Sequence, residues 1–171
     1  MTPAKPDLRI WLLGLLAFAI VIALGLPLQT NTPFGIIDHQ AAGDAVRVDA
    51  IQAAWRDAGL RGFAMVGMVG DLIFIGIYGL GSWRAGRSFA RMNIPSLKLL
   101  GNIITIAAIL FCFTDYVETG LQLLQMMQDR GSDWMAGTEA FMQPIKILAW
   151  IMTFTGILAA LVVRRFSRTG A

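Results

Sequence analysis

The sequence is poor in charged residues, cysteine and histidine. Asp, Glu, Lys and Arg make up 15% of the 171 residues, and the chain has one cysteine and one histidine. One cysteine excludes an intramolecular disulfide, and one histidine excludes a haem held by two histidines. Hydrophobic residues make up 56% and the mean hydropathy is +0.64, which excludes a soluble domain of ordinary composition. We therefore expect a membrane protein.

Four apolar stretches are long enough to cross a bilayer as helices, which takes about 20 residues each. They lie at about 10–28, 62–83, 99–123 and 141–163. They leave room for short connections, so we expect an all-α integral membrane four-helix bundle that forms a single domain over residues 1–171. The first stretch is longer than the apolar core of a cleaved signal peptide, so we expect it to be retained as an anchor.

Basic residues gather on one side of these stretches. Nine of the fourteen flank that side, where Asp7 is the only acidic residue: Lys5, Arg9, Arg84, Arg87, Arg91, Lys98, Arg164, Arg165 and Arg168. Because Lys and Arg accumulate on the cytoplasmic side of membrane proteins, we expect both termini to be cytoplasmic, in a multi-pass protein of the bacterial inner membrane. The net charge of +3 then reflects topology, and we expect no nucleic-acid partner.

The long connection between the first two stretches contains an amphipathic pattern. From Asp44 to Ala58, apolar residues recur at spacings of three and four, which predicts a helix at about 44–58. Asp44 suits its N-cap, and Gly59 suits its end. We expect this helix to lie along the outer membrane interface, with Trp55 as an anchor, or to cover the bundle.

Two further connections carry specific expectations. Asp38, His39 and Gln40 precede the amphipathic helix, and we expect them to face an outer vestibule. Residues 83–96 are expected to form a short basic loop, with Pro95 near the start of the third span.

Three acidic residues, Asp71, Asp115 and Glu118, lie within the apolar stretches. A carboxylate near the bilayer centre costs about 2.5 to 3.5 kcal/mol, so it needs a structural or functional reason. From the helical rise we expect all three at a similar depth in the outer half of the membrane. Asp115, Glu118 and Gln122 share one helix face, which must turn inward because lipid cannot hydrogen-bond to it.

Lys146, in the fourth stretch, is expected at the same depth and is the expected counter-ion of these acids. Such a pair could serve only to fix helix register, and Lys146 could instead extend to the headgroups. The residues that we expect to form a common pocket are Asp38, His39, Asp71, Tyr78, Asp115, Glu118, Gln122 and Lys146.

Familiar catalytic and metal-binding patterns are missing from the sequence. It has no H-E-x-x-H and no Glu-x-x-His motif, so we expect no metal and no cofactor. Cys112 lies in an apolar stretch without a basic neighbour, so we expect a buried hydrophobe and no nucleophile. Gly76, Gly79 and Gly81 follow a small-residue pattern that lets helices pack closely.

Several segments resemble those of other membrane proteins. They are IDHQAAG and IQAAW in the first outer connection, DLIFIGIYGL in the second span and DYVETGLQLLQ in the third. These segments, within residues 33–125, are similar to those of a group of uncharacterised bacterial four-span membrane proteins. The resemblance implies four helices with an acidic cluster in the outer half, and it carries no activity.

The function expected from these residues is binding of a membrane lipid, a small molecule or a partner transmembrane helix, because catalytic motifs are missing. One alternative is an intramembrane enzyme acting on a lipid-linked substrate, with Asp71 or Asp115 as general base and Lys146 as electrostatic stabiliser. Another is proton-coupled transport, since intramembrane acids relay protons. A pathway through so few helices would need a homo-oligomer.

Overall fold

The computed structural model describes residues 6–169, and of residues 168 and 169 only the backbone. The described chain forms helices and contains no strand. In order these are α1 (Arg9–Asn31), α2 (Ile36–Gln40), α3 (Ala45–Asp57), α4 (Arg61–Ala90), α5 (Pro95–Gln128) and α6 (Asp133–Thr169). The protein is therefore an all-α bundle, as its four long apolar stretches predict.

Four helices, α1, α4, α5 and α6, are long and apolar enough to cross a membrane. Large hydrophobic side chains also cover the outside of the bundle. Leu16, Ile106 and Phe113, for example, are exposed at 58%, 67% and 61%. Apolar patches of this extent suit contact with lipid and not with water. The chain is thus a multi-pass membrane protein.

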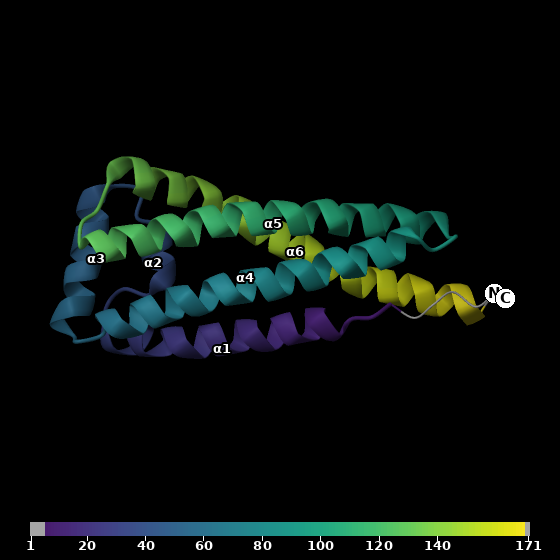
Figure 1. Ribbon diagram of the computed structural model, residues 1–171, viewed down its shortest axis with the longest axis horizontal. Coiled ribbons are helices and arrows are strands. Elements are labelled where there is room, and N and C mark those ends of the chain that lie inside the picture. The colour runs from purple at the N-terminus through teal and green to yellow at the C-terminus, as the bar shows by residue number, and fades with distance from the viewer. Residues whose placement is uncertain (1–5, 170–171) are drawn as a thin grey trace.

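The long helices pack in sequence, α1 on α4, α4 on α5 and α5 on α6. The start of α1, the α4–α5 turn and the end of α6 lie at one end of the bundle, and α2, α3 and the α5–α6 turn lie at the other (Figure 1). We call the second the capped end. α1 does not pack along α6, which it meets through the ring pairs Trp11–Phe154 and Phe18–Trp150.

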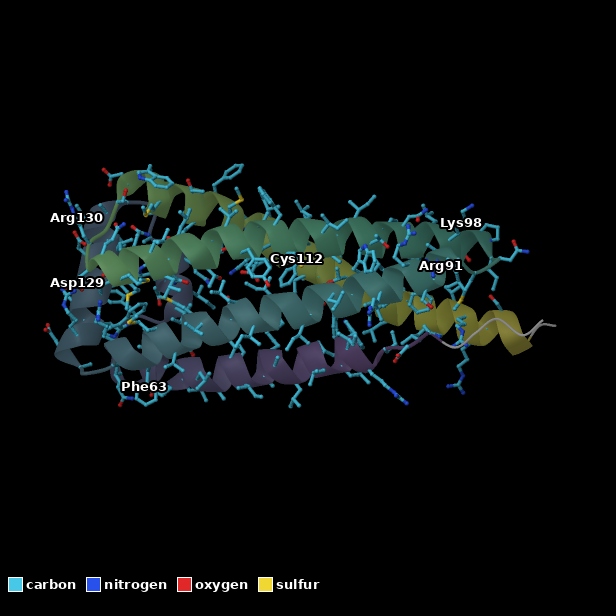
Figure 2. All side chains as sticks on the ribbon, in the orientation of Figure 1. Phe63, Arg91, Lys98, Cys112, Asp129 and Arg130 are labelled. Atoms are coloured by element: carbon cyan, nitrogen blue, oxygen red, sulfur yellow. The ribbon has the colours of Figure 1, made fainter. Side chains whose placement is uncertain are left out.

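The two ends of the bundle carry different charged residues. Arg91 and Lys98 lie toward the end that holds the α4–α5 turn, whereas Asp129 and Arg130 lie at the capped end (Figure 2). Asp129 there forms an ion pair with Arg56 of α3, which fastens the cap to the α5–α6 turn. Two residues that the sequence assigns to the basic side are not described: Lys5 lies outside the described residues, and so does the side chain of Arg168.

The expected basic loop at 83–96 is much shorter than the sequence suggests. α4 continues to Ala90 and α5 begins at Pro95, so only residues 91–94 connect them. The helix continues because Ala85 and Phe89 are fully buried, while Arg84 and Arg87 are exposed. Pro95 is tolerated at the start of α5, where a helix needs no backbone N–H.

The predicted amphipathic helix is present as α3. The Asp44 carboxylate accepts a hydrogen bond from the backbone N–H of Arg47, and Gly59 follows the helix with φ of +70°. The expected interfacial role of Trp55 is wrong. Its side chain is fully buried, its Nε1 donates to the carbonyl of Phe34, and its ring stacks on His39. α3 therefore covers the bundle.

Glycines set the closest helix contacts. A Cβ on Gly14 would lie 2.6 Å from the Cα of Tyr78, and one on Gly81 would lie 2.6 Å from the Cα of Trp11. Both sites join α1 to α4. Gly25, further along α1, has no atom within 4 Å of the position its Cβ would occupy. The α1 and α4 backbones thus come closest near the beginning of α1, and space remains beside Gly25.

We predict opposite effects of alanine at Gly14 and Gly25. Gly25→Ala should stabilise the bundle by about 1 kcal/mol through helix propensity alone. Gly14→Ala should lose about 1 to 3 kcal/mol, because the new methyl group pushes α1 off the α4 backbone. Thermal unfolding in detergent measures both. Equal shifts at the two positions would contradict the close contact.

Candidate functional site

The polar stripe expected on the third span is present on α5. Asp115, Glu118 and Gln122 are all buried, with exposed fractions of 2%, 0% and 0%. The stripe faces α6, where Lys146 places its Nζ 2.9 Å from Asp115 Oδ1 and 2.8 Å from Glu118 Oε1. Lys146 therefore pairs with both acids and does not extend to the headgroups.

Asp71 joins this group from α4. Its Oδ2 accepts a hydrogen bond of 2.8 Å from the hydroxyl of Thr119, which stands beside Glu118 on α5. Three spanning helices thus contribute to what we call the carboxylate cluster, composed of Asp71, Asp115, Glu118 and Lys146. With three carboxylates and one ammonium, it has a formal charge of −2 when all are ionised. Asp71 and Lys146 are partly exposed, whereas Asp115 and Glu118 are buried.

A cavity of about 280 Å³ lies against the carboxylate cluster. Asp71, Asp115 and Lys146 form part of its wall, and Glu118 does not reach it. Apolar residues from α1, α4, α5 and α6 form much of the remainder, including Phe18, Val21, Ile22, Phe74, Phe111, Ile147 and Trp150. We call this space the central cavity. It combines one charged wall with an apolar interior.

Missing side chains create much of this space. Gly25 of α1 and Gly67 of α4 both line the central cavity, and neither has an atom within 4 Å of the position its Cβ would occupy. Gly67 is nevertheless buried. Its lack of a side chain therefore opens a volume inside the protein.

The central cavity opens between α1 and α6. Two of its lining residues, Ile22 on α1 and Ile147 on α6, remain 52% and 48% exposed. Both lie within apolar helices that are long enough to span a membrane. Since α1 and α6 do not pack along each other, the cavity opens sideways between two helices of membrane-spanning length.

Aromatic side chains close the cavity on the side away from the capped end. Phe18 stands 5.3 Å from both Phe74 and Trp150 by ring centroids, and Phe74 stands 5.9 Å from Phe111. Tyr78 packs beneath them, 6.1 Å from Trp150. We call the rings of Phe18, Phe74, Phe111 and Trp150 the aromatic floor. They separate the carboxylate cluster from the opposite end of the bundle.

The capped end covers the cavity through α2. Gln122 Nε2 donates to the carbonyl of Ile36, and Gln143 Nε2 donates to the carbonyl of Ile37, both at 3.4 Å. Ile36, Ile37 and Gln40 of α2 line the central cavity. α2 is therefore a short lid held by two glutamines.

A second buried polar group lies under the cap. His39 Nδ1 stands 3.4 Å from Glu139 Oε2, and Glu139 Oε1 accepts a 2.6 Å hydrogen bond from Gln125 Nε2. Gln52 Nε2 lies 3.3 Å from His39 Nε2. His39, Gln52, Gln125 and Glu139 are buried. This network ties α2, α3, α5 and α6 together and does not line the central cavity.

Three of the residues expected in the common pocket belong neither to the central cavity nor to the carboxylate cluster. Asp38 is exposed, and its carboxylate accepts the backbone N–H of Gly35 at the start of α2. His39 belongs to the network under the cap. Tyr78 is buried in the core below the cavity, where its hydroxyl bonds to Thr153 at 2.8 Å. Within α2, His39 is buried under the cap and Asp38 is exposed.

Other contributors were missed by reasoning from the sequence. Glu139 lies just before the fourth apolar stretch, and its three-residue spacing from Ala136, which is also buried, places both on one inward helix face. No spacing pattern in the sequence marks Gly25, Gly67 or Gln143. Their importance depends on which helices leave a gap between them.

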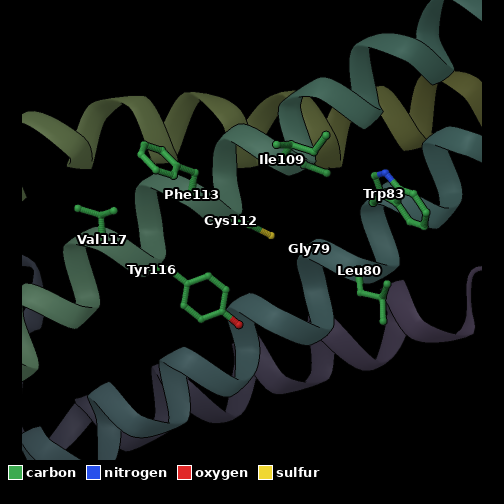
Figure 3. A pocket seen from close by; sticks show the side chains of 9 residues that line it. Gly79, Leu80, Trp83, Ile109, Cys112, Phe113, Tyr116 and Val117 are labelled. Atoms are coloured by element: carbon green, nitrogen blue, oxygen red, sulfur yellow. The ribbon is translucent and has the colours of Figure 1, made fainter.

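A larger groove of about 510 Å³ lies between α4 and α5 and contains no charged side chain (Figure 3). Its lining includes Cys112, whose sulfur points toward Gly79 (Figure 3). Cys112 Sγ donates to the carbonyl of Ile75 at 3.8 Å. No basic group touches the thiol among the described contacts, so nothing activates it as a nucleophile.

No group of three or more His, Cys, Asp or Glu side chains within residues 6–169 is arranged to hold a metal ion. No protein-family model, curated protein or solved structure matches the chain. Functional inference therefore rests on the geometry of the central cavity.

We predict that Lys146 and Glu118 are energetically coupled. Lys146→Met should destabilise the bundle by about 3 to 5 kcal/mol, because it leaves two carboxylates buried without a counter-ion. Adding Glu118→Gln should recover part of that loss by removing the like-charge repulsion with Asp115. Thermal unfolding of the two single variants and the double variant in detergent gives the coupling, and strictly additive effects would refute it.

Proposed function

We propose that this protein binds a single amphiphilic molecule, a lipid or a lipid-like small molecule, in the central cavity. The observation that carries this proposal is a cavity with a charged wall and an apolar interior that opens toward lipid between α1 and α6. Binding pockets are typically apolar, with a few polar groups that orient the ligand. The polar end of the molecule would lie at the carboxylate cluster, and its chain would leave between Ile22 and Ile147.

The same geometry weighs against catalysis by the carboxylate cluster. An electrostatic stabiliser must direct a donor at charge that develops on the substrate. Lys146 instead contacts Asp115 and Glu118 at 2.9 and 2.8 Å, so its charge is already compensated. Asp71 retains access to the cavity as a base, but no activated partner stands beside it. A binding role uses all of these features, whereas an enzyme would need groups that are missing from the described cavity wall.

Transport also finds less support than binding. The aromatic floor of Phe18, Phe74, Phe111 and Trp150 blocks the way from the cavity to the end with the α4–α5 turn. A proton or solute path through one chain would have to open this packed layer. Access from one side suits a protein that holds or presents a ligand.

We further propose that the capped end faces the outside of a bacterial cytoplasmic membrane and that both termini are cytoplasmic. The basic residues Arg84, Arg87 and Arg91 lie at or next to the α4–α5 turn, at the end where α1 begins and α6 ends. Positive charge is retained on the cytoplasmic side during insertion. The cavity would then lie in the outer half of the bilayer.

Filling the central cavity tests the binding function. Gly67→Leu should stabilise the protein by about 1 kcal/mol, because leucine favours a helix more than glycine does and the space is empty. It should also abolish phospholipid binding that is tight enough to persist when the detergent micelle is removed. Native mass spectrometry in a total bacterial lipid extract measures such adducts.

Gly120→Leu is the matched control. Gly120 also lies inside a spanning helix with no atom within 4 Å of its absent Cβ, but it does not line the central cavity. The Gly120→Leu variant should gain similar stability and retain the phospholipid adduct. The binding proposal fails if the wild-type protein carries no tightly held adduct, or if Gly67→Leu carries as much as wild type.

The orientation is tested by thiol labelling in intact cells, in a Cys112→Ala background. A cysteine at Val46, which is 80% exposed on α3, should react with a membrane-impermeant maleimide. A cysteine at Asn93, exposed in the α4–α5 turn, should react only after permeabilisation. Labelling of Asn93→Cys in intact cells would reverse the assignment.

A further inference from the structure

The polar wall of the central cavity has acceptors that lack donors. Gln122 lines the cavity and is fully buried, yet its Oε1 has no hydrogen-bond partner. A buried acceptor without a donor costs about 1 to 3 kcal/mol, and a bound ligand can remove that cost. A molecule in the cavity that supplies an N–H or O–H group to this wall would satisfy the oxygen.

The orientation of the Gln122 amide follows from its surroundings. Its nitrogen faces the carbonyl of Ile36, which can only accept a hydrogen bond. Turning the amide over would place two acceptors against each other. Oε1 is therefore the atom left for the ligand.

Asp71 offers a second acceptor and also a charge. The one hydrogen bond that it receives from the described residues is from Thr119, on Oδ2. The single ammonium of the carboxylate cluster, that of Lys146, contacts Asp115 and Glu118 instead. Asp71 consequently borders the cavity as a carboxylate without a direct counter-ion.

The aromatic floor adds a third feature of the same kind. Phe18, Phe74 and Trp150 line the central cavity close to the charged wall. Aromatic faces attract cations, and the attraction grows when the cation is shielded from water. They give no comparable stabilisation to an anion.

We propose that the ligand of the central cavity carries an ammonium group on an apolar chain, and that Asp71 and Gln122 bind this group above the aromatic floor. This assignment rests on the proposed binding function and names the chemical class of its ligand. The Asp71 carboxylate supplies the counter-charge and Gln122 Oε1 accepts an N–H. The apolar remainder of the ligand lies along Val21, Ile22 and Ile147 toward the lipid.

Other ligand classes fit less well. A fatty acid or a phosphate monoester would bring negative charge to a wall on which two carboxylates, Asp71 and Asp115, face one ammonium, Lys146. A bare metal ion would need several oxygen ligands and would gain nothing from the apolar surface. An ammonium amphiphile satisfies the charge, the free acceptors and the apolar volume together.

Headgroup selectivity tests the assignment on the intact protein. Dodecylamine, dodecyltrimethylammonium, dodecanol and dodecanoate share one chain and differ in charge and hydrogen-bonding capacity. Each is added to wild-type protein in nanodiscs at neutral pH, below the concentration at which it forms micelles. Thermal unfolding and displacement of the lipid adduct report binding. We expect dodecylamine to bind best and at least about tenfold more tightly than dodecanol, and dodecanoate to bind weakest.

Substitutions of acidic residues identify the side chain that binds the ammonium group. Asp71→Asn keeps the shape of the side chain. It should weaken the binding of dodecylamine about tenfold or more and leave the binding of dodecanol unchanged. Asp57→Asn is the control, because Asp57 is an exposed acid at the end of α3 and does not line the cavity. The headgroup series on the wild-type protein decides the question even if Asp71→Asn does not fold.

The outcomes separate the two proposals. If dodecanol or dodecanoate binds as tightly as dodecylamine, the ammonium assignment is wrong while the binding function stands. Equal stabilisation by sodium chloride alone would mean that an inorganic cation suffices, and it would also overturn the assignment. If neither a lipid nor any of the four probes binds, the binding function itself fails.

Discussion

The contact of Lys146 with two carboxylates is the interaction on which the rest of the structure depends. It joins α6 to α5 inside the apolar part of the bundle, where an isolated charge would be costly. Because this one ammonium serves Asp115 and Glu118, Asp71 has to be held by other means. Thr119 supplies a hydrogen bond, and the remaining capacity of Asp71 is directed to the central cavity. One pairing thus holds two helices together and leaves a charged wall on an internal space.

Glycine has two opposite uses around this charged wall. At Gly14 and Gly81 it brings the α1 and α4 backbones together, since any side chain would collide with the neighbouring helix. At Gly25 and Gly67 it keeps space open, since a side chain would meet nothing. Hence the backbones of α1 and α4 nearly touch at Gly14 and Gly81, whereas space remains inside the bundle beside Gly25 and Gly67. The same residue type builds both the packed half and the hollow half of the bundle.

The sequence predicts some parts of this arrangement and not others, for physical reasons. Helical rise places Asp71, Asp115 and Lys146 at one depth, and helical periodicity turns Gln122 inward, so much of the charged wall follows from spacing alone. The cavity does not, because it depends on α1 and α6 failing to pack, which neither helix reveals alone. The position of His39 depends on the short helix α2, whose five residues are too few for periodicity to identify.

Several features of the central cavity lower the stability of the bundle, and they occur together. Glycine inside a helix costs up to about 1 kcal/mol relative to alanine, and Gly25 and Gly67 gain no close packing in return. The buried Oε1 of Gln122 has no donor, and the one ammonium contacts only two of the three carboxylates. An ion pair that served only to hold helices would need one acid and no empty space. Stabilising substitutions commonly reduce function where activity needs a destabilised site. The convergence of these costs on one cavity therefore favours a ligand-binding role over a purely structural one.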